Sequence, residues 1–289
     1  MNHLSSEKKI QSRFCIFFIC LTFNLSIYPQ TFVNIESGVL FTGLNNIRNG
    51  TNGTLFSLKN DLSTSPSIFL RIRAGFLLNN KHYFSILYAP LKSLATGAID
   101  RNILFDEKNF KANTPLEAVY KFNSYRLTYN QRIINNNNFK FGLGLSAKIR
   151  DAGTTLKNKE LLSENFSTGF APLINVLSSW NISQKAVVNF LGEGIIASKG
   201  RAIDLSLSGR YSFTKSLKGN IGYRLLEGGA DGTNRYNFIR FHFIFAGLNF
   251  SFKKKVNRTK IARGYIDTPE DKKLYISELT EKDLPIFID

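Results

Sequence analysis

Regular alternation of apolar and polar residues is the feature that most constrains how this chain can fold. From Phe139 to Ile149 every second residue is apolar, and the residues between them are Lys, Gly or Ser. The same two-residue period recurs over 125–132 and 203–213. A period of two places the apolar side chains on one face of a β-strand and the polar ones on the other. Because helical periodicity is almost absent between residues 31 and 252, we predict an all-β protein.

The alternating segments predict ten strands. They cover residues 31–43, 66–78, 81–92, 115–134, 138–152, 166–181, 184–198, 201–214, 217–227 and 236–252. Short links at 79–80, 135–137, 182–183 and 215–216 alternate with longer ones at 44–65, 93–114, 153–165 and 228–235, and only the link near 199–200 breaks the pattern. Outer-membrane barrels have short periplasmic turns, longer external loops and an even number of strands. We therefore predict a transmembrane antiparallel up-and-down β-barrel of about ten strands (between 8 and 12), with both ends in the periplasm.

The two faces of these strands differ in chemistry. The apolar face is large and aromatic, which suits contact with lipid, whereas the polar face is rich in Arg and Gly, which suits a lumen. A soluble β-sandwich or a lipocalin-like barrel would instead turn the apolar face inward. The sequence alone leaves open which face points inward, so the soluble fold remains an alternative.

The first thirty residues have the pattern of a secretory signal. Lys8, Lys9 and Arg13 precede an apolar stretch over 14–25 that is too short to cross a bilayer, and cleavage is expected near Gln30. An uncleaved anchor helix is the alternative. Both cysteines of the chain lie inside this segment, so the exported chain is expected to contain no disulfide and no Cys-based metal site.

The chain changes character after Phe252. Residues 253–289 are charged and lack the strand pattern, so we expect a short periplasmic tail that could bind a periplasmic partner. The last strand ends in Asn249-Phe250-Ser251-Phe252, and a terminal Phe resembles the signal by which the barrel assembly machinery recognises outer-membrane barrels. The predicted organisation is a signal over 1–30, a barrel over 31–252 and a tail over 253–289.

Several segments resemble a family of uncharacterised outer-membrane barrels that is common in Bacteroidetes. These segments are GTLFSL at 53–58, FNSYRLTY at 122–129, AKIRDA at 147–152, GRAID at 200–204 and YRLLEGGAD at 223–231. The resemblance covers most of residues 31–252 and excludes the tail. It implies an exported barrel in the bacterial outer membrane, in contact with membrane lipid and lipopolysaccharide, and it brings no known activity.

Charged residues collect on the polar faces of the predicted strands. A ten-stranded barrel is narrow enough for side chains to fill its interior, and buried charges need partners. We therefore predict an internal salt-bridge network, in which Glu193 and Asp204 are the expected acids for Arg126 and Arg210. A path that binds or conducts an anion is the alternative, because Arg exceeds acid. The candidate network comprises Arg71, Arg73, Arg126, Arg150, Glu193, Asp204, Arg210, Arg224 and Glu227, with Arg132 and Lys148 on the same faces.

Catalytic chemistry has little support in the sequence. His82 follows a predicted periplasmic turn and His242 lies inside the last strand, so no histidine is placed beside an acid in an external loop. The candidate acids for a hydrolase of lipid or peptide are Asp151, Asp204, Glu227 and Asp231. No metal-ligand spacing appears and no cofactor is expected. Basic residues are spread along the strands without forming one patch, which argues against nucleic-acid binding.

The prediction is therefore an integral outer-membrane barrel, without enzymatic activity, whose narrow lumen or external loops bind or pass small solutes. An outer-membrane hydrolase and a purely structural barrel are the alternatives. A cluster of Ser or Asp with His at the outer rim would favour the hydrolase. An open lumen would favour a pore, and a docked, ordered tail would favour the structural barrel.

Overall fold

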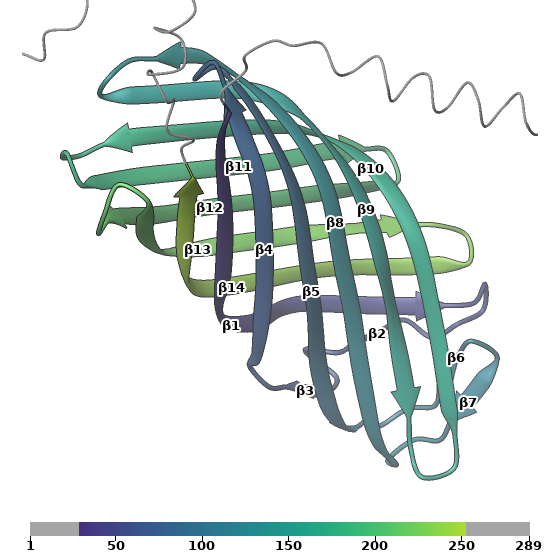
Figure 1. The fold of residues 1–289 in the computed structure, drawn as a ribbon. Coiled ribbons are helices and arrows are strands. Elements are labelled where there is room, and N and C mark those ends of the chain that lie inside the picture. The colour runs from purple at the N-terminus through teal and green to yellow at the C-terminus, as the bar shows by residue number, and fades with distance from the viewer. Residues whose placement is uncertain (1–28, 253–289) are drawn as a thin grey trace, which may run out of the picture. The chain divides into compact units, whose positions relative to one another are not determined.

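The computed structural model describes residues 29–252, which form a closed antiparallel β-barrel (Figure 1). Each long strand pairs with the next along the chain, and β1 pairs with β14 to close the barrel. The ten long strands are β1 (Gln30–Asn49), β4 (Ser67–Leu78), β5 (His82–Ala98), β8 (Pro115–Asn135), β9 (Phe139–Lys157), β10 (Leu162–Asn181), β11 (Ala186–Ala197), β12 (Gly200–Ser212), β13 (Leu217–Asp231) and β14 (Arg235–Phe252). The predicted ten-stranded barrel is confirmed.

Four short strands lie outside this set. They are β2 (Phe56–Ser57), which pairs with β1, β3 (Ser63–Thr64), which pairs with β5, and β6 (Ile103–Phe105) and β7 (Lys108–Phe110), which form a hairpin. The hairpin was not predicted, because three-residue strands are too short to show alternation. All four belong to the segments 50–66 and 99–114, which are the longest connections between long strands.

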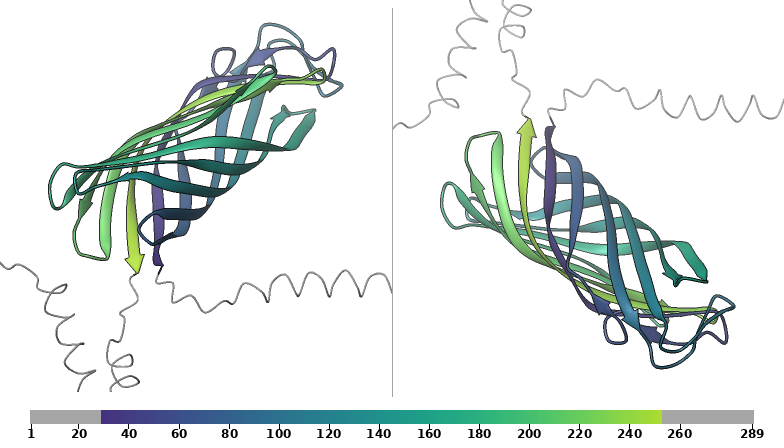
Figure 2. Two further views of the ribbon diagram at one scale, coloured as in Figure 1. Left: turned by 90° about the horizontal axis from the view of Figure 1, so that it is seen from above. Right: turned by 90° about the horizontal axis from the view of Figure 1, so that it is seen from below.

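The two ends of the barrel are different (Figure 2). At the termini end, Thr31 of β1 pairs with Phe252 of β14, and the turns are short. The opposite end, called the loop end, carries the segments 50–66 and 99–114. Two of the loops predicted at that end are wrong: the links at 153–165 and 228–235 are tight turns over 158–161 and 232–234. Pairing continues almost to each turn, as far as Lys157 with Leu162 and Asp231 with Tyr236, so the strands are longer than the sequence pattern predicted.

The polar face of the strands points inward and the apolar face points outward. Ile68 and Phe170, for example, are 83% and 68% exposed, whereas Arg126 and Asn175 are buried. A soluble barrel would have the opposite arrangement, so the alternative of a lipocalin-like fold is wrong. The lumen toward the loop end is filled by buried apolar side chains, among them Phe56, Phe105 and Phe110 from the short strands.

The predicted signal and tail lie largely outside the part of the chain that the structure describes. Residues 1–28 and 253–289 are not described, so the cleavage site near Gln30 and the role of the tail remain predictions. Between residues 29 and 252 no helix is long and apolar enough to cross a bilayer.

Candidate functional site

Arg126 lies at the centre of a buried cluster of charges in the lumen. Its guanidinium forms ion pairs with Glu193 of β11 and with Asp204 of β12, the latter with 2.5 Å between Nη2 and Oδ2. Arg224 of β13 contacts the same aspartate through two hydrogen bonds, from Nε to Oδ1 at 2.6 Å and from Nη2 to Oδ2 at 3.1 Å. All four side chains are at most 5% exposed. Their mutual pairing offsets the large cost of removing isolated charges from water.

The cluster extends to Glu36 of β1, the strand that β14 separates from β13. Its Oε2 atom lies 3.3 Å from Nη1 of Arg71 and 3.8 Å from Nη1 of Arg224. Glu193 also accepts a hydrogen bond of 2.7 Å from Oγ of Ser146. We call these side chains the waist network; it consists of Arg71, Arg126 and Arg224 with Glu36, Glu193 and Asp204. The three cations and three carboxylates balance, and their side chains occupy the lumen between its two ends.

Other residues predicted for the network lie elsewhere. Arg210 is not the partner of Asp204: it lies six positions further along β12, about 20 Å in an extended strand. Arg73 donates a 3.1 Å hydrogen bond to Oγ of Ser85 and forms no ion pair among the described residues. Arg150 lies on the loop-end side of the waist network, where it lines a separate cavity.

Glu227 was predicted to face the lumen, and this prediction is wrong. It pairs across the sheet with Ile203 and Arg240, and the latter is largely exposed on the outer face. Its carboxylate contacts Arg201 at 2.7 Å and Arg240 at 2.6 Å. Its neighbour Leu226 is the residue that points inward and is buried. The error arose because alternation is weak in the glycine-rich segment that follows Glu227.

Glu36 is a member of the waist network that sequence reasoning missed. It is the acid on the polar face of the first alternating segment, between Asn34 and Gly38, and Val33, Ile35 and Val39 occupy the other face. The alternation could therefore have identified it as a lumen acid.

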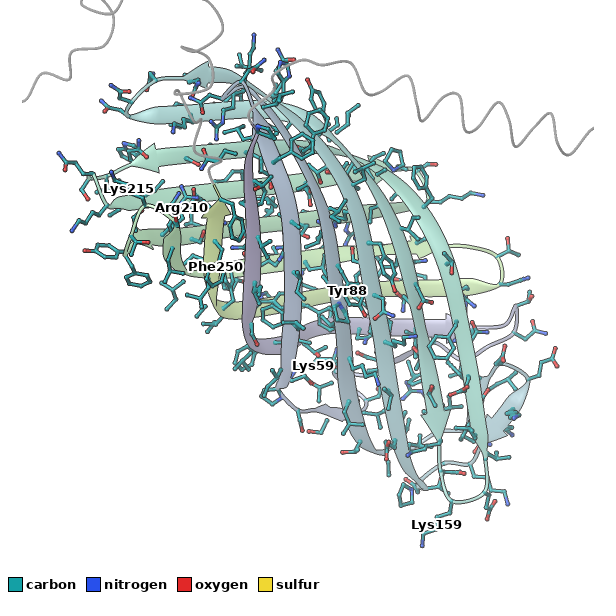
Figure 3. All side chains as sticks on the ribbon, in the orientation of Figure 1. Lys59, Tyr88, Lys159, Arg210, Lys215 and Phe250 are labelled. Carbon is teal, nitrogen blue, oxygen red and sulfur yellow. The ribbon has the colours of Figure 1, made fainter. Side chains whose placement is uncertain are left out.

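A polar cavity of about 410 Å³ lies on the termini-end side of the waist network. We call this cavity the vestibule. Arg210 projects from β12 near the end of the barrel that carries Lys215, whereas Lys59 and Lys159 mark the loop end (Figure 3). The charged residues that line the vestibule are six cations and one carboxylate, namely Arg71, Arg73, Arg132, Lys140, Arg210, Lys218 and Glu36.

Several guanidinium groups of the vestibule have unsatisfied donors. Nη2 of Arg71, Nη2 of Arg73 and Nε of Arg210 are buried and have no hydrogen-bond partner within residues 29–252. Buried polar atoms are nearly always hydrogen-bonded in folded proteins, so three unpartnered donors in one cavity indicate a missing acceptor. Glu36 is not that acceptor, because it already contacts Arg71 and Arg224. The vestibule is thus a cationic cavity with spare hydrogen-bond donors.

Neither His82 nor His242 is found beside an acid at the loop end of the described barrel, as the hydrolase alternative required. His82 starts β5 at the termini end, where Nδ1 is 3.0 Å from the hydroxyl of Tyr129. His242 is on the outer face, and its Nδ1 is 2.5 Å from the hydroxyl of Tyr223. Neither forms an ion pair with a carboxylate in the part of the chain that the structure describes. Two candidate acids are engaged elsewhere, Asp151 with Lys121 and Asp231 with Arg48.

The closed barrel, with apolar residues outward and charges inward, defines an integral β-barrel of the bacterial outer membrane. Comparison with solved structures agrees. Outer membrane protease OmpT from Escherichia coli superposes with a TM-score of 0.52 at 11% sequence identity, covering 79% of this chain and 99% of that one. The translocator domain of autotransporter NalP from Neisseria meningitidis gives 0.41 at 12% identity, covering 86% and 97%. At 11% sequence identity, the likeness to OmpT shows the fold alone.

No family model matches the chain, and no curated protein matches it. The resemblance to a Bacteroidetes family of barrels therefore remains a prediction. The outer-membrane barrel fold and the bacterial outer membrane as its location do not depend on it.

Proposed function

We propose that this protein is a non-enzymatic outer-membrane barrel that binds a small, multiply charged oxyanion in the vestibule and does not conduct solutes along its axis. The observation that carries the proposal is the set of unpartnered guanidinium donors of Arg71, Arg73 and Arg210 in one cavity. Guanidinium groups bind oxyanions through strong, charge-assisted hydrogen bonds. An oxyanion would satisfy these donors and offset the excess of positive charge.

The size and shape of the vestibule support a binding site. Its volume of about 410 Å³ lies within the range of roughly 300–1,000 Å³ that is typical of small-molecule sites. With the termini in the periplasm, as the short turns predict, the vestibule would open toward the periplasm. Its ligand would then be a periplasmic solute, and the waist network would form the inner wall of the site.

The interior beyond the vestibule supports a closed barrel. The waist network is paired and buried, and the loop end is packed with side chains such as Phe105 and Phe110, which are fully buried. A hydrated solute would have to break the buried ion pairs and displace this apolar packing. The external loops that we expected to bind or pass solutes therefore serve mainly to fill the loop end.

Titration calorimetry with citrate as the probe tests the site. Purified protein in detergent micelles should bind citrate, and the affinity should fall as salt screens the charges. Arg73→Met removes donors without leaving an acid unpaired, and it should weaken binding at least tenfold, because a hydrogen bond to a charged group contributes about 1.5–3 kcal/mol. Arg101→Met, which changes an exposed loop arginine, is the control and should leave the affinity unchanged.

Two results would overturn the proposal. Citrate affinity that is unaffected by both Arg73→Met and Arg210→Met would remove the vestibule as the site. A steady ion current through the wild-type protein in planar bilayers would show that the waist network does not close the lumen.

A further inference from the structure

The pairing between β10 and β11 stops halfway along β10. Residues Ile174–Asn181 pair with β11, whereas Leu162–Leu173 pair with β9 alone. β11 ends at Ala197 and the chain turns back into β12, so that β10 continues past its neighbour toward the loop end (Figures 1 and 2). Over 167–173 the edge of β10 that faces β11 has no backbone hydrogen-bond partner among the described residues. An unpaired strand edge in a membrane must face protein, water or a ligand.

Local sequence explains why the strands separate here. Pro172 lies two residues before the pairing begins and has no N–H to donate to a ladder. The opposite side of the separation includes three small residues, Ala197, Gly200 and Ala202, beside Ile195 and Arg201. The side chains of the three small residues are too short to fill the space between β10 and the strands beyond it.

A second cavity, of about 300 Å³, lies at this separation. Residues 169–172 of β10 form one side and the ends of β11 and β12 form the other. The inner wall is apolar and is made by the buried side chains of Tyr120, Phe122, Leu226 and Ile239. The waist network separates this cavity from the vestibule, since the lining of the two cavities has no residue in common. We call it the lateral cavity.

Two basic side chains line the lateral cavity. Lys148 is 5% exposed and lies over the ring of Phe122, with 5.1 Å from Nζ to the ring centre. Arg150 lies two residues further along β9 and also lines the cavity. Neither forms an ion pair within residues 29–252, and Glu227, which also lines the cavity, is held by Arg201 and Arg240. A buried ammonium group without a counter-charge is costly, so the site favours an anion.

The residues beside the separation face lipid. Phe170 and Ile174 on β10 and Ile196 on β11 point outward and are 63–77% exposed. A ligand that enters between these strands would come from the apolar layer of the membrane. The site thus combines a lipid-facing entrance, an apolar wall and two inner cations.

We infer that the lateral cavity binds a single-chain anionic amphiphile, a fatty carboxylate, taken up from the outer membrane. The carboxylate would lie against Lys148 and Arg150, and the chain would follow Phe122, Leu226 and Ile239 toward the separation between β10 and β11. A cavity of this volume suits one medium-length chain, because it is at the small end of the range of about 300–1,000 Å³ for ligand sites. A phospholipid offers similar charge but brings two chains.

Displacement of a fluorescent probe tests this inference. The full-length protein is placed in nanodiscs of neutral phosphatidylcholine and titrated with 11-(dansylamino)undecanoic acid. Dodecanoate should displace the probe, whereas dodecanol, which has the same chain without the charge, should not. Lys148→Met should weaken probe binding by about tenfold or more, because it removes one charge-assisted contact. Lys140→Met is the matched control: it removes a lysine from the same strand on the vestibule side, and the affinity should not change.

A cavity-filling variant gives independent evidence. At Gly169 the three atoms nearest to an added Cβ belong to the Arg150 side chain, at 3.4 Å or more, so Gly169→Leu should be accepted by the backbone and extend into the cavity. Probe binding should be lost while heat-modifiable migration on gels shows a folded barrel. If this variant does not fold, Lys148→Met still tests the inference, because methionine can keep the contact with Phe122 and the change strands no carboxylate of the described residues.

Three outcomes would overturn the inference. Equal displacement by dodecanol and dodecanoate would show that the cations do not take part. Displacement by a two-chain phosphatidic acid at lower concentration than dodecanoate would assign the site to phospholipid. Probe binding that is the same in Lys148→Met and wild type would indicate partition into the bilayer.

Discussion

Arg126 and Asp204 belong to strands that share no edge, yet their Nη2 and Oδ2 atoms lie 2.5 Å apart across the lumen. β8 pairs with β5 and β9, and β12 pairs with β11 and β13. The contact therefore joins opposite parts of the wall through side chains alone. Arg126 also contacts Glu193, so its guanidinium links β8 to both β11 and β12. Arg224 of β13 contacts Asp204 as well. The interior of this narrow barrel is thus held by charge pairing at its waist and by apolar packing toward the loop end.

Replacing Arg126 should destabilise the barrel strongly. Arg126→Met leaves Glu193 buried without its cation, and breaking a buried ion pair from one side costs roughly 3–5 kcal/mol. Urea unfolding in detergent, followed by fluorescence of Trp180, should show a lower midpoint. Adding Glu193→Gln should recover part of the loss, because the stranded charge is then removed and Ser146 can still hydrogen-bond to the side chain. Lys140→Met is the control. It removes a lumen cation that forms no ion pair in the described residues, so it should change the urea midpoint little. An equal fall of the midpoint in Lys140→Met and Arg126→Met would contradict the role of the waist network.

Gly144 of β9 should be required because the backbone of β8 leaves no space for a side chain there. A Cβ added to Gly144 would clash with the carbonyl oxygen of Tyr129 and lie 2.6 Å from Cα of Asn130, both rigid backbone atoms of β8. Gly144→Ala should therefore destabilise the barrel by about 1–3 kcal/mol, as overpacked sites do. At Gly209 an added Cβ would meet nothing within 4 Å, so Gly209→Ala is the control and should be neutral. Similar urea midpoints for the two variants would show that β9 moves away from β8 at little cost.

Much of the fold could be predicted from the sequence, because every strand of a membrane barrel alternates between lipid-facing and lumen-facing residues and therefore shows a two-residue period. Alternation over 139–149 identified β9 and divided its residues into an apolar and a polar face, but which of the two faces points inward is given only by the burial of the side chains. The strand ends were less predictable. Between Ala152 and Phe166 the residues on the two faces are similar in polarity. The sequence therefore shows no alternation there, and the extension of β9 and β10 toward their turn could not be predicted.

The candidate site was less predictable because contacts across a lumen depend on strand tilt and stagger. Arg126 and Arg210 both lie on polar faces, and the sequence gives no reason to separate them. In the structure Arg126 is level with Glu193 and Asp204, whereas Arg210 lies in the vestibule. The separation of β10 from β11 was also invisible, because the alternation of each strand continues through it.

Contact between the loops at the loop end should depend on pH only in acid. Arg101 donates a 2.8 Å hydrogen bond to Oδ2 of Asp61, and the backbone N–H of Ser57 donates another of 2.8 Å. Partial burial of Asp61 opposes its ionisation, but these hydrogen bonds outweigh burial and hold its pKa below the ordinary value. A lowered pKa means that the contact is stable above the unfolded value of about 3.9 and is lost as the pH falls through the lower folded value.

Hydrogen exchange measured by mass spectrometry can check this dependence. Protection of the peptide over 55–64, corrected for intrinsic exchange, should stay constant from neutral pH to about pH 4, near the unfolded pKa, and fall below that. Asp61→Asn should lower protection above about pH 4 to the level that the wild type reaches in acid, and it should remove the acid transition. Loss of protection already near neutral pH in the wild-type protein would show that another group controls these loops.

Phe252 should matter for assembly more than for stability. It ends β14, pairs with Thr31 and is 57% exposed on the outer face. An acidic residue near a membrane interface costs at most about 1 kcal/mol, so Phe252→Asp should barely change the urea midpoint of refolded protein. Phe213, which is 58% exposed at the same end of the barrel, provides a matched control for loss of an aromatic contact with lipid. If the terminal Phe is read by the barrel assembly machinery, heat-modifiable protein in the outer-membrane fraction should fall several-fold for Phe252→Asp and stay near wild type for Phe213→Asp. Equal losses in the two variants would assign the effect to lipid contact, and no loss in either would remove Phe252 as an assembly signal.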